Sequence, residues 1–126
     1  MRALLLPLAL AATPLWALDV PSGQLVTLQE VLIDEVGAET WLRFRFLAPQ
    51  IAREGGSIPY DLAAEDIAFL CTDLALPYLA EYALTGEVVV ISLADRATEF
   101  GVPDPDATQF FEAFRIVDNT CTFEDF

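Results

Sequence analysis

The side chains of this chain that could carry out chemistry are two cysteines, Cys71 and Cys121, and 20 acidic residues, because its 126 residues include no histidine and no lysine. A cysteine thiol becomes reactive when a neighbouring cation lowers its pKa, and the sequence offers only arginine for that role. The missing residue types exclude Ser-His and Cys-His nucleophile pairs, imidazole metal ligands, Schiff bases and lysine-dependent phosphate loops. Two isolated cysteines cannot hold a structural zinc ion or an iron–sulfur cluster. We therefore expect neither a cofactor nor a metal.

Carboxylates remain as possible catalytic groups. A glycosidase needs only two of them, about 5–9.5 Å apart, one with a pKa raised by burial. With 20 acids in the sequence, many pairs exist and no pair stands out. A small carboxylate-dependent hydrolase is therefore the alternative to a non-catalytic protein, which the sequence favours.

One acidic segment, DRATEFGVPDPDA (95–107), lies between two predicted strands. Its Asp-Arg pair could orient a ligand, or the arginine could tie the loop down. The DPD triplet could supply calcium ligands but lacks the EF-hand spacing, and it equally has the pattern of a helix start. The candidate polar site in this region comprises Asp95, Arg96, Asp104, Asp106 and Gln109.

The first 17 residues, MRALLLPLALAATPLWA, have the layout of a secretory signal peptide. One positive charge at Arg2 precedes an apolar run, and small residues lead to Ala17. A membrane anchor would need about 20 apolar residues, and two prolines interrupt this shorter run. We predict cleavage after Ala17, with Ala11 as the alternative, and a periplasmic or secreted mature domain at 18–126.

The predicted mature chain carries 5 arginines against 20 acids, a net charge of −15. Such a surface repels nucleic acid and anionic lipid headgroups. We expect no nucleic-acid partner and no membrane association of the mature form.

Hydrophobic periodicity predicts the elements that position these residues. Apolar and polar residues alternate through 24–37 and 38–49, around a turn at Gly37, which predicts a hairpin. From Asp61, a plausible N-cap, an apolar stripe at helical spacing predicts a helix that Pro77 ends, followed by a short helix at 77–83.

The remaining elements are strands. The uncharged, β-branched interior of 87–94 predicts a central strand buried on both faces, and strands at 109–117 and 120–126 flank a turn at 118–119. Phe110 and Phe111 must then face opposite sides of the sheet, and Phe126 is expected to be exposed. The order β-β-α-β-β-β predicts an α+β two-layer sandwich, a mainly antiparallel sheet with one helix packed across a face.

An even cysteine count in an exported domain predicts a disulfide. Cys71 lies on the apolar stripe of the helix and so points at the sheet. Cys121 lies in the last strand, on the same side as Phe123. A structural bridge between Cys71 and Cys121 follows, rather than a reactive thiol.

Several segments resemble a family of small exported bacterial proteins without an assigned function: LCTDLALP (70–77), VVVISLADR (88–96), FG (100–101), DPDATQFFEAFRI (104–116) and FEDF (123–126). The resemblance covers roughly residues 65–126 and includes the cysteine-bearing C-terminal hairpin. Similar sequences carry automatic labels of acetolactate synthase. The residues do not support that activity, since a thiamine-diphosphate enzyme is several times longer and carries a metal-diphosphate motif. The sequence thus predicts a non-catalytic exported module that binds a protein partner or a small ligand.

Overall fold

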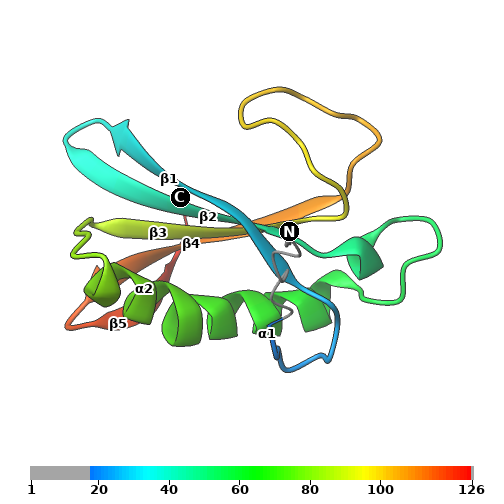
Figure 1. The fold of residues 1–126 in the computed structure, drawn as a ribbon, viewed down its shortest axis with the longest axis horizontal. Helices are drawn as coiled ribbons and strands as arrows, with labels where there is room; N and C mark the ends of the chain where they lie inside the picture. The colour runs from blue at the N-terminus through cyan, green and yellow to red at the C-terminus, as the bar shows by residue number, and fades with distance from the viewer. Residues whose placement is uncertain (1–17, 126) are drawn as a thin grey trace, which may run out of the picture.

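The computed structural model describes residues 18–125, in which five strands form one sheet and a helix packs across one of its faces (Figure 1). This is the predicted α+β arrangement, with the predicted order of elements. The predicted signal peptide at 1–17 and Phe126 lie outside the described residues. In the described part, no helix is long and apolar enough to cross a membrane.

The sheet has the strand order β1-β2-β3-β4-β5. Its strands are β1 (Thr27–Val36), β2 (Glu39–Leu47), β3 (Val88–Ala94), β4 (Gln109–Val117) and β5 (Thr120–Glu124). Three of the neighbouring pairs are antiparallel, and β2 and β3 are parallel. A parallel pair needs a crossover connection, which the helix supplies. Asp118 and Asn119 turn between β4 and β5 with φ of 52° and 57°, as in the tight hairpins that favour these residue types.

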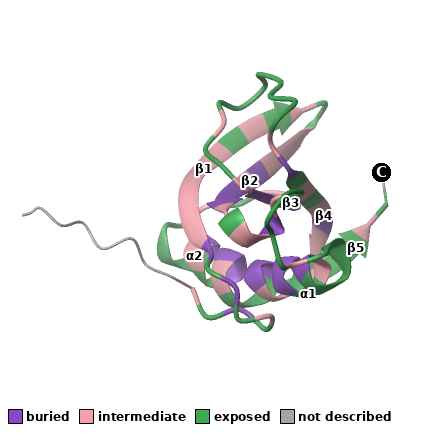
Figure 2. Cartoon of the chain, turned by 90° about the vertical axis from the view of Figure 1, so that its right-hand side faces the viewer, coloured by how far each residue is buried: buried purple, intermediate pink, exposed green. Residues whose placement is uncertain are grey.

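The core lies between the helix and the sheet, as the buried segments in Figure 2 show. Alternation directs Leu42, Phe44 and Phe46 of β2 toward the helix, and all three are at most 1% exposed. The same spacing buries Ile91 of β3, and Ile67 of the helix meets this surface. All seven residues of β3 are buried, which confirms its prediction as a central strand.

The helix differs from its prediction at both ends. It begins at Tyr60 after Pro59, so Asp61 lies in the first turn and is not the N-cap. The helix also continues past Pro77, as α1 (Tyr60–Leu70), a π-helical segment (Cys71–Ala75) and α2 (Leu76–Glu81). In the π turn the Leu76 N–H donates to the Cys71 carbonyl, five residues back. The wider turn removes the clash that a proline ring makes in a regular α-helix, so Pro77 does not end the helix.

The DPD triplet does not start a helix. The Asp104 carboxylate accepts the Asp106 N–H at 3.0 Å, and the Asp104 carbonyl accepts the Ala107 N–H at 3.1 Å. Asp side chains often stabilise turns in this way. Because β4 begins at Gln109, the chain has room for this turn and not for a helix.

Asp66 is a buried carboxylate that the sequence reasoning did not single out. One of its oxygens accepts the Ser22 N–H at 2.9 Å, and the other accepts the Ser22 hydroxyl at 2.5 Å and the Gln24 amide at 2.7 Å. These bonds hold the segment before β1 against the helix. The sequence did contain a signal for Asp66, which lies three residues after Ala63 on the apolar stripe of the helix. A charged residue at such a position is rarely fully buried unless it has partners.

The predicted disulfide is present between Cys71 and Cys121, whose Cα atoms are 6.3 Å apart. It joins the π-helical segment to β5, the strand at one edge of the sheet. The bridge therefore fixes the C-terminal edge of the sheet to the helix that covers it.

Replacing both cysteines, Cys71→Ala with Cys121→Ala, should lower the free energy of unfolding in urea by roughly 4 kcal/mol, because the bridge spans 50 residues. Dithiothreitol should lower the midpoint of the wild type and leave that of the double variant unchanged. Equal midpoints for oxidised wild type and the double variant, or two titratable thiols in the oxidised, unfolded wild type, would contradict this assignment.

Candidate functional site

The helix covers one face of the sheet, and we call the other the open face. Loop 95–108 arches over one end of the open face (Figure 1). Strand alternation places the following side chains on the open face: Trp41, Arg43 and Arg45 of β2, Val88, Val90 and Ser92 of β3, and Phe111, Ala113 and Arg115 of β4. Three of the five arginines in residues 18–126 thus lie on one surface of an acidic protein.

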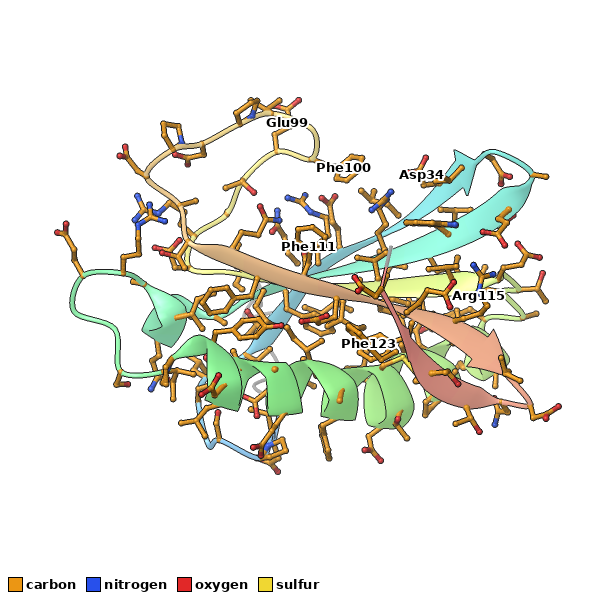
Figure 3. All side chains as sticks on the ribbon, turned by 180° about the vertical axis from the view of Figure 1, so that it is seen from behind. Asp34, Glu99, Phe100, Phe111, Arg115 and Phe123 are labelled. Atoms are coloured by element: carbon orange, nitrogen blue, oxygen red, sulfur yellow. A yellow bond between two sulfur atoms is a disulfide. The ribbon has the colours of Figure 1, made fainter. Side chains whose placement is uncertain are left out.

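A cavity of about 380 Å³ lies between the open face and the loop. This volume is in the range of small-molecule sites. Its lining includes Arg43, Arg45, Ser92, Phe100, Val102 and Phe111. Figure 3 shows Phe100 reaching from the loop toward the open face, and Phe111 rising from β4 below it.

Arg45 attaches the loop to the sheet. Its side chain is only 6% exposed, and it forms an ion pair with Glu30 of the neighbouring strand. Its Nη2 donates to the carbonyl and to the hydroxyl of Thr98, at 3.1 and 2.9 Å. The Gln29 amide donates to the same carbonyl at 3.2 Å. The first half of the loop is therefore fixed above β1 and β2.

Arg43 is held by stacking and by one ion pair. Its guanidinium lies over the rings of Trp41 and Phe100, at 5.4 and 5.2 Å from the ring centroids. Its Nε donates to the Asp34 carboxylate at 2.9 Å. No hydrogen bond to its Nη1 or Nη2 occurs within residues 18–125. Since cation–π contacts orient the guanidinium plane, these N–H groups are positioned before any ligand binds.

The other end of the open face is bound together by Arg115. Its guanidinium pairs with Glu39 of β2 at 2.7 Å and with Glu124 of β5 at 3.0 Å. The hydrogen bond from Arg115 lowers the pKa of Glu39, and one from Trp41 adds to it. Arg115 does not line the cavity.

Two of the residues predicted as a polar site, Asp95 and Arg96, lie at the base of the loop. Asp95 accepts the Thr108 N–H at 2.7 Å and the Arg96 guanidinium at 2.9 Å. The hydrogen bond from Arg96 is the main cause of a lowered pKa of Asp95, to which the Thr108 N–H contributes. Asp95 thus joins the two ends of the loop through the Thr108 N–H, whereas Arg96 bonds only to its sequence neighbour Asp95 within residues 18–125.

Of the other three predicted residues, Asp104 and Asp106 lie in the loop and Gln109 begins β4. Asp104 stabilises its own turn, and Asp106 lies near Arg96, whose pKa is raised chiefly by Asp95. Gln109 lines the open-face cavity. Within residues 18–125, no group of three or more cysteine and acidic side chains is placed to hold a metal ion.

The sequence reasoning missed the cavity itself, although signals for two parts of it were present. The alternation through 38–49 puts Arg43 and Arg45 on the polar side of the predicted strand, and the adjacent Phe110 and Phe111 had to face opposite sides of the sheet. Phe110 does contact Tyr60 of the helix, and Phe111 is 65% exposed on the open face. Nothing in the sequence places Phe100 over the two arginines, because that contact depends on the path of the loop.

The hydrolase alternative requires two carboxylates facing one cavity. Glu99 is the one acidic residue that lines the open-face cavity. Glu112 has a pKa raised by burial and by the charge of Asp125, and it contacts the Tyr60 hydroxyl. However, Glu112 lies on the helix side of the sheet, so it cannot act together with Glu99 in this cavity.

A second hollow, of about 560 Å³, lies between loop 51–59 and the start of β4. Arg53 is the one charged residue in its lining, and the Arg53 guanidinium already donates to the Pro105 carbonyl at 2.9 Å. This hollow is larger, and Arg53 keeps N–H groups without an acceptor within residues 18–125. However, Phe110 is the one aromatic residue in its lining, and the cation–π contacts of the described residues all lie at the open-face cavity. We therefore take the open-face cavity as the candidate site.

Fold and site together define a small α+β domain with a ligand-sized cavity on the open face of its sheet. The chain belongs to a family of unknown function, DUF6497, whose family model matches residues 4–126. Neither the curated proteins nor the solved structures yield a match to the chain.

Asp95→Asn should weaken the base of the loop at neutral pH, because the amide loses the charge that pairs with Arg96. Since folding lowers the pKa of Asp95 below 3.8, its carboxylate stabilises the protein above that pH, and this contribution is lost as the pH falls through the folded-state pKa. The free energy of unfolding in urea should thus be lower for the variant at about pH 7, and the difference should be smaller at about pH 3, which lies below the ordinary pKa of 3.8. Glu54→Gln, which changes an exposed acid of the neighbouring loop, is the control and should have little effect. A wild type and Asp95→Asn variant of equal stability at both pH values would refute this role for Asp95.

Proposed function

We propose that the protein is an exported, non-catalytic binding module whose small-molecule ligand occupies the open-face cavity. The observation that carries this proposal is the cavity of about 380 Å³ in which an oriented arginine meets exposed aromatic side chains. Sites of this kind, mostly apolar with a few placed polar groups, are typical of small-molecule binding.

The chemistry of the lining supports binding rather than catalysis. The two cysteines form a disulfide, so neither is a thiolate nucleophile. Glu99 has no second carboxylate beside it in the lining, which a glycosidase-type mechanism would require. A hydrolase is therefore the less favoured function.

Two features support export to the periplasm. Residues 1–17 have the pattern of a signal peptide, and a disulfide between Cys71 and Cys121 persists in oxidising compartments. Export by this route predicts that the mature protein isolated from the periplasmic fraction begins at Leu18. N-terminal sequencing checks this start. A sequence beginning at Met1 would refute processing, and one beginning at Ala12 would select the alternative cleavage site.

N-phenyl-1-naphthylamine, an uncharged fluorescent probe, should bind the wild type with enhanced emission, because the cavity walls are largely apolar. Phe111→Ser removes an exposed wall residue and should weaken binding roughly tenfold, equivalent to about 1.4 kcal/mol. The matched control is Phe123→Ser. Phe123 is 59% exposed, and it lies on the helix side of the sheet beside Phe114 (Figure 3).

Equal weakening by Phe111→Ser and Phe123→Ser would show that the probe binds exposed aromatic side chains without using the cavity. Absence of saturable binding to the wild type would contradict the proposal directly. In that case the other predicted function, binding of a protein partner, would replace small-molecule binding.

A further inference from the structure

We propose that the open-face cavity recognises a carboxylate attached to an apolar body, and that Arg43 is the residue that binds the carboxylate. This inference rests on the proposed function and names the ligand class for the same cavity. It follows from the donors that the cavity presents, from its apolar walls and from the way in which Arg43 is held.

Arg43 has unused hydrogen-bonding capacity directed at the cavity. A guanidinium carries five N–H groups, and the Nε–H of Arg43 is taken by Asp34. The four N–H groups on Nη1 and Nη2 have no acceptor within residues 18–125. The side chain is 21% exposed and belongs to the cavity lining. A planar, bidentate acceptor is the group that best fits such a fork, and a carboxylate is that group.

Arg45 differs from Arg43 and cannot play this role. Its side chain is nearly buried, and its Nη1 and Nη2 are already engaged by Glu30 and Thr98. It fixes the loop that forms the cavity roof. The two neighbouring arginines of β2 are therefore divided between holding the roof and binding the ligand.

Neutral donors lie in the same lining. The Ser92 hydroxyl on β3 and the Gln109 side-chain amide on β4 both line the cavity, and neither side chain forms a hydrogen bond within residues 18–125. With Arg43 they make a surface that is rich in donors. Glu99 is the one carboxylate in the lining, and it belongs to the roof loop. Asp34 and Glu30 already balance the charges of the two guanidinium groups, so the preference for an anion comes from the N–H donors of Arg43 that lack an acceptor.

The walls select a ligand with an apolar body. Phe111, Val102 and Phe100 are 65, 52 and 47% exposed, and all three line the cavity. Covering such side chains is favourable by about 25 cal/mol for each Å² of apolar surface removed from water. An inorganic anion or a sugar would leave this surface exposed, so a carboxylate with a hydrocarbon or aromatic body fits best.

The acidic surface does not oppose this assignment. Charges elsewhere on the protein are screened over about 8 Å at physiological ionic strength, whereas a carboxylate and a guanidinium meet at about 2.8 Å. Long-range repulsion acts mainly on the rate of association. The affinity depends on the local donors.

The test uses displacement of N-phenyl-1-naphthylamine from the full mature protein by decanoate, decanol and decylamine, which share one apolar chain. Decanoate should displace the probe at a concentration at least roughly tenfold lower than decanol, since hydrogen bonds to a charged group are worth about 1.5–3 kcal/mol. Decylamine should be the weakest competitor. Arg43→Gln should remove the advantage of decanoate over decanol, with each competitor's displacement corrected for the probe affinity of the same variant.

Arg115→Gln is the matched control. Arg115 lies on the same open face but outside the cavity lining, so this variant should retain the preference for decanoate. Arg43→Lys, which keeps the charge and loses the planar fork, should retain a reduced preference. Thermal melting establishes that each variant is folded, and if Arg43→Gln is not, Arg43→Lys and the wild-type ligand series carry the test.

The outcomes separate this inference from the proposed function. If the probe binds in the cavity but decanoate and decanol compete equally, the ligand class is wrong and the binding site stands. If decanoate is preferred and Arg43→Gln or Arg43→Lys leaves that preference intact, the role of Arg43 is wrong. If the probe does not bind, the proposed function fails and the inference falls with it.

Discussion

A five-stranded sheet has two faces, and the described chain supplies one helix to cover them. On the covered face, side chains such as Phe44 and Phe46 are fully buried against the helix, and each contributes about 1.5–3 kcal/mol by leaving water. Residues 18–125 supply no second apolar layer for the other face. Its strands instead carry arginines there, and one loop folds over part of the surface. The open face, and with it the cavity, is a consequence of this constraint.

Arg45 holds the loop that forms the roof of the cavity. A nearly buried cation without partners would cost several kcal/mol, so the structure must bring acceptors to it. One acceptor is Glu30 on the adjacent strand, and the others belong to Thr98, which lies 53 residues further along the chain. Satisfying Arg45 therefore draws the loop down onto the sheet and places Phe100 over Arg43. The cavity owes its roof to this hydrogen bonding.

Local pattern predicted most of the fold, and the failures lie at the helix ends, in the DPD turn and in features that depend on distant contacts. Alternation identified the hairpin, the apolar run identified β3, and the helical stripe gave the side on which Cys71 meets Cys121. Pro77 misled because a helix with a π turn tolerates a proline that a regular helix excludes. The site was predicted less well, since its roof exists only when Thr98 reaches Arg45. Of the five predicted site residues, Gln109 lines the cavity. Asp95 and Asp104 instead accept backbone hydrogen bonds within the loop.

The central claim is that a ligand binds between the open face and loop 95–108. Amide ¹H–¹⁵N correlation spectra recorded during titration with N-phenyl-1-naphthylamine test it most directly, because an aromatic ligand shifts the amides that it approaches. The account predicts the largest changes at Arg43, Ser92, Phe111 and residues 98–102, with little change along the helix at 60–81. Changes centred on the helix or on loop 51–59, or no saturable change at all, would contradict it.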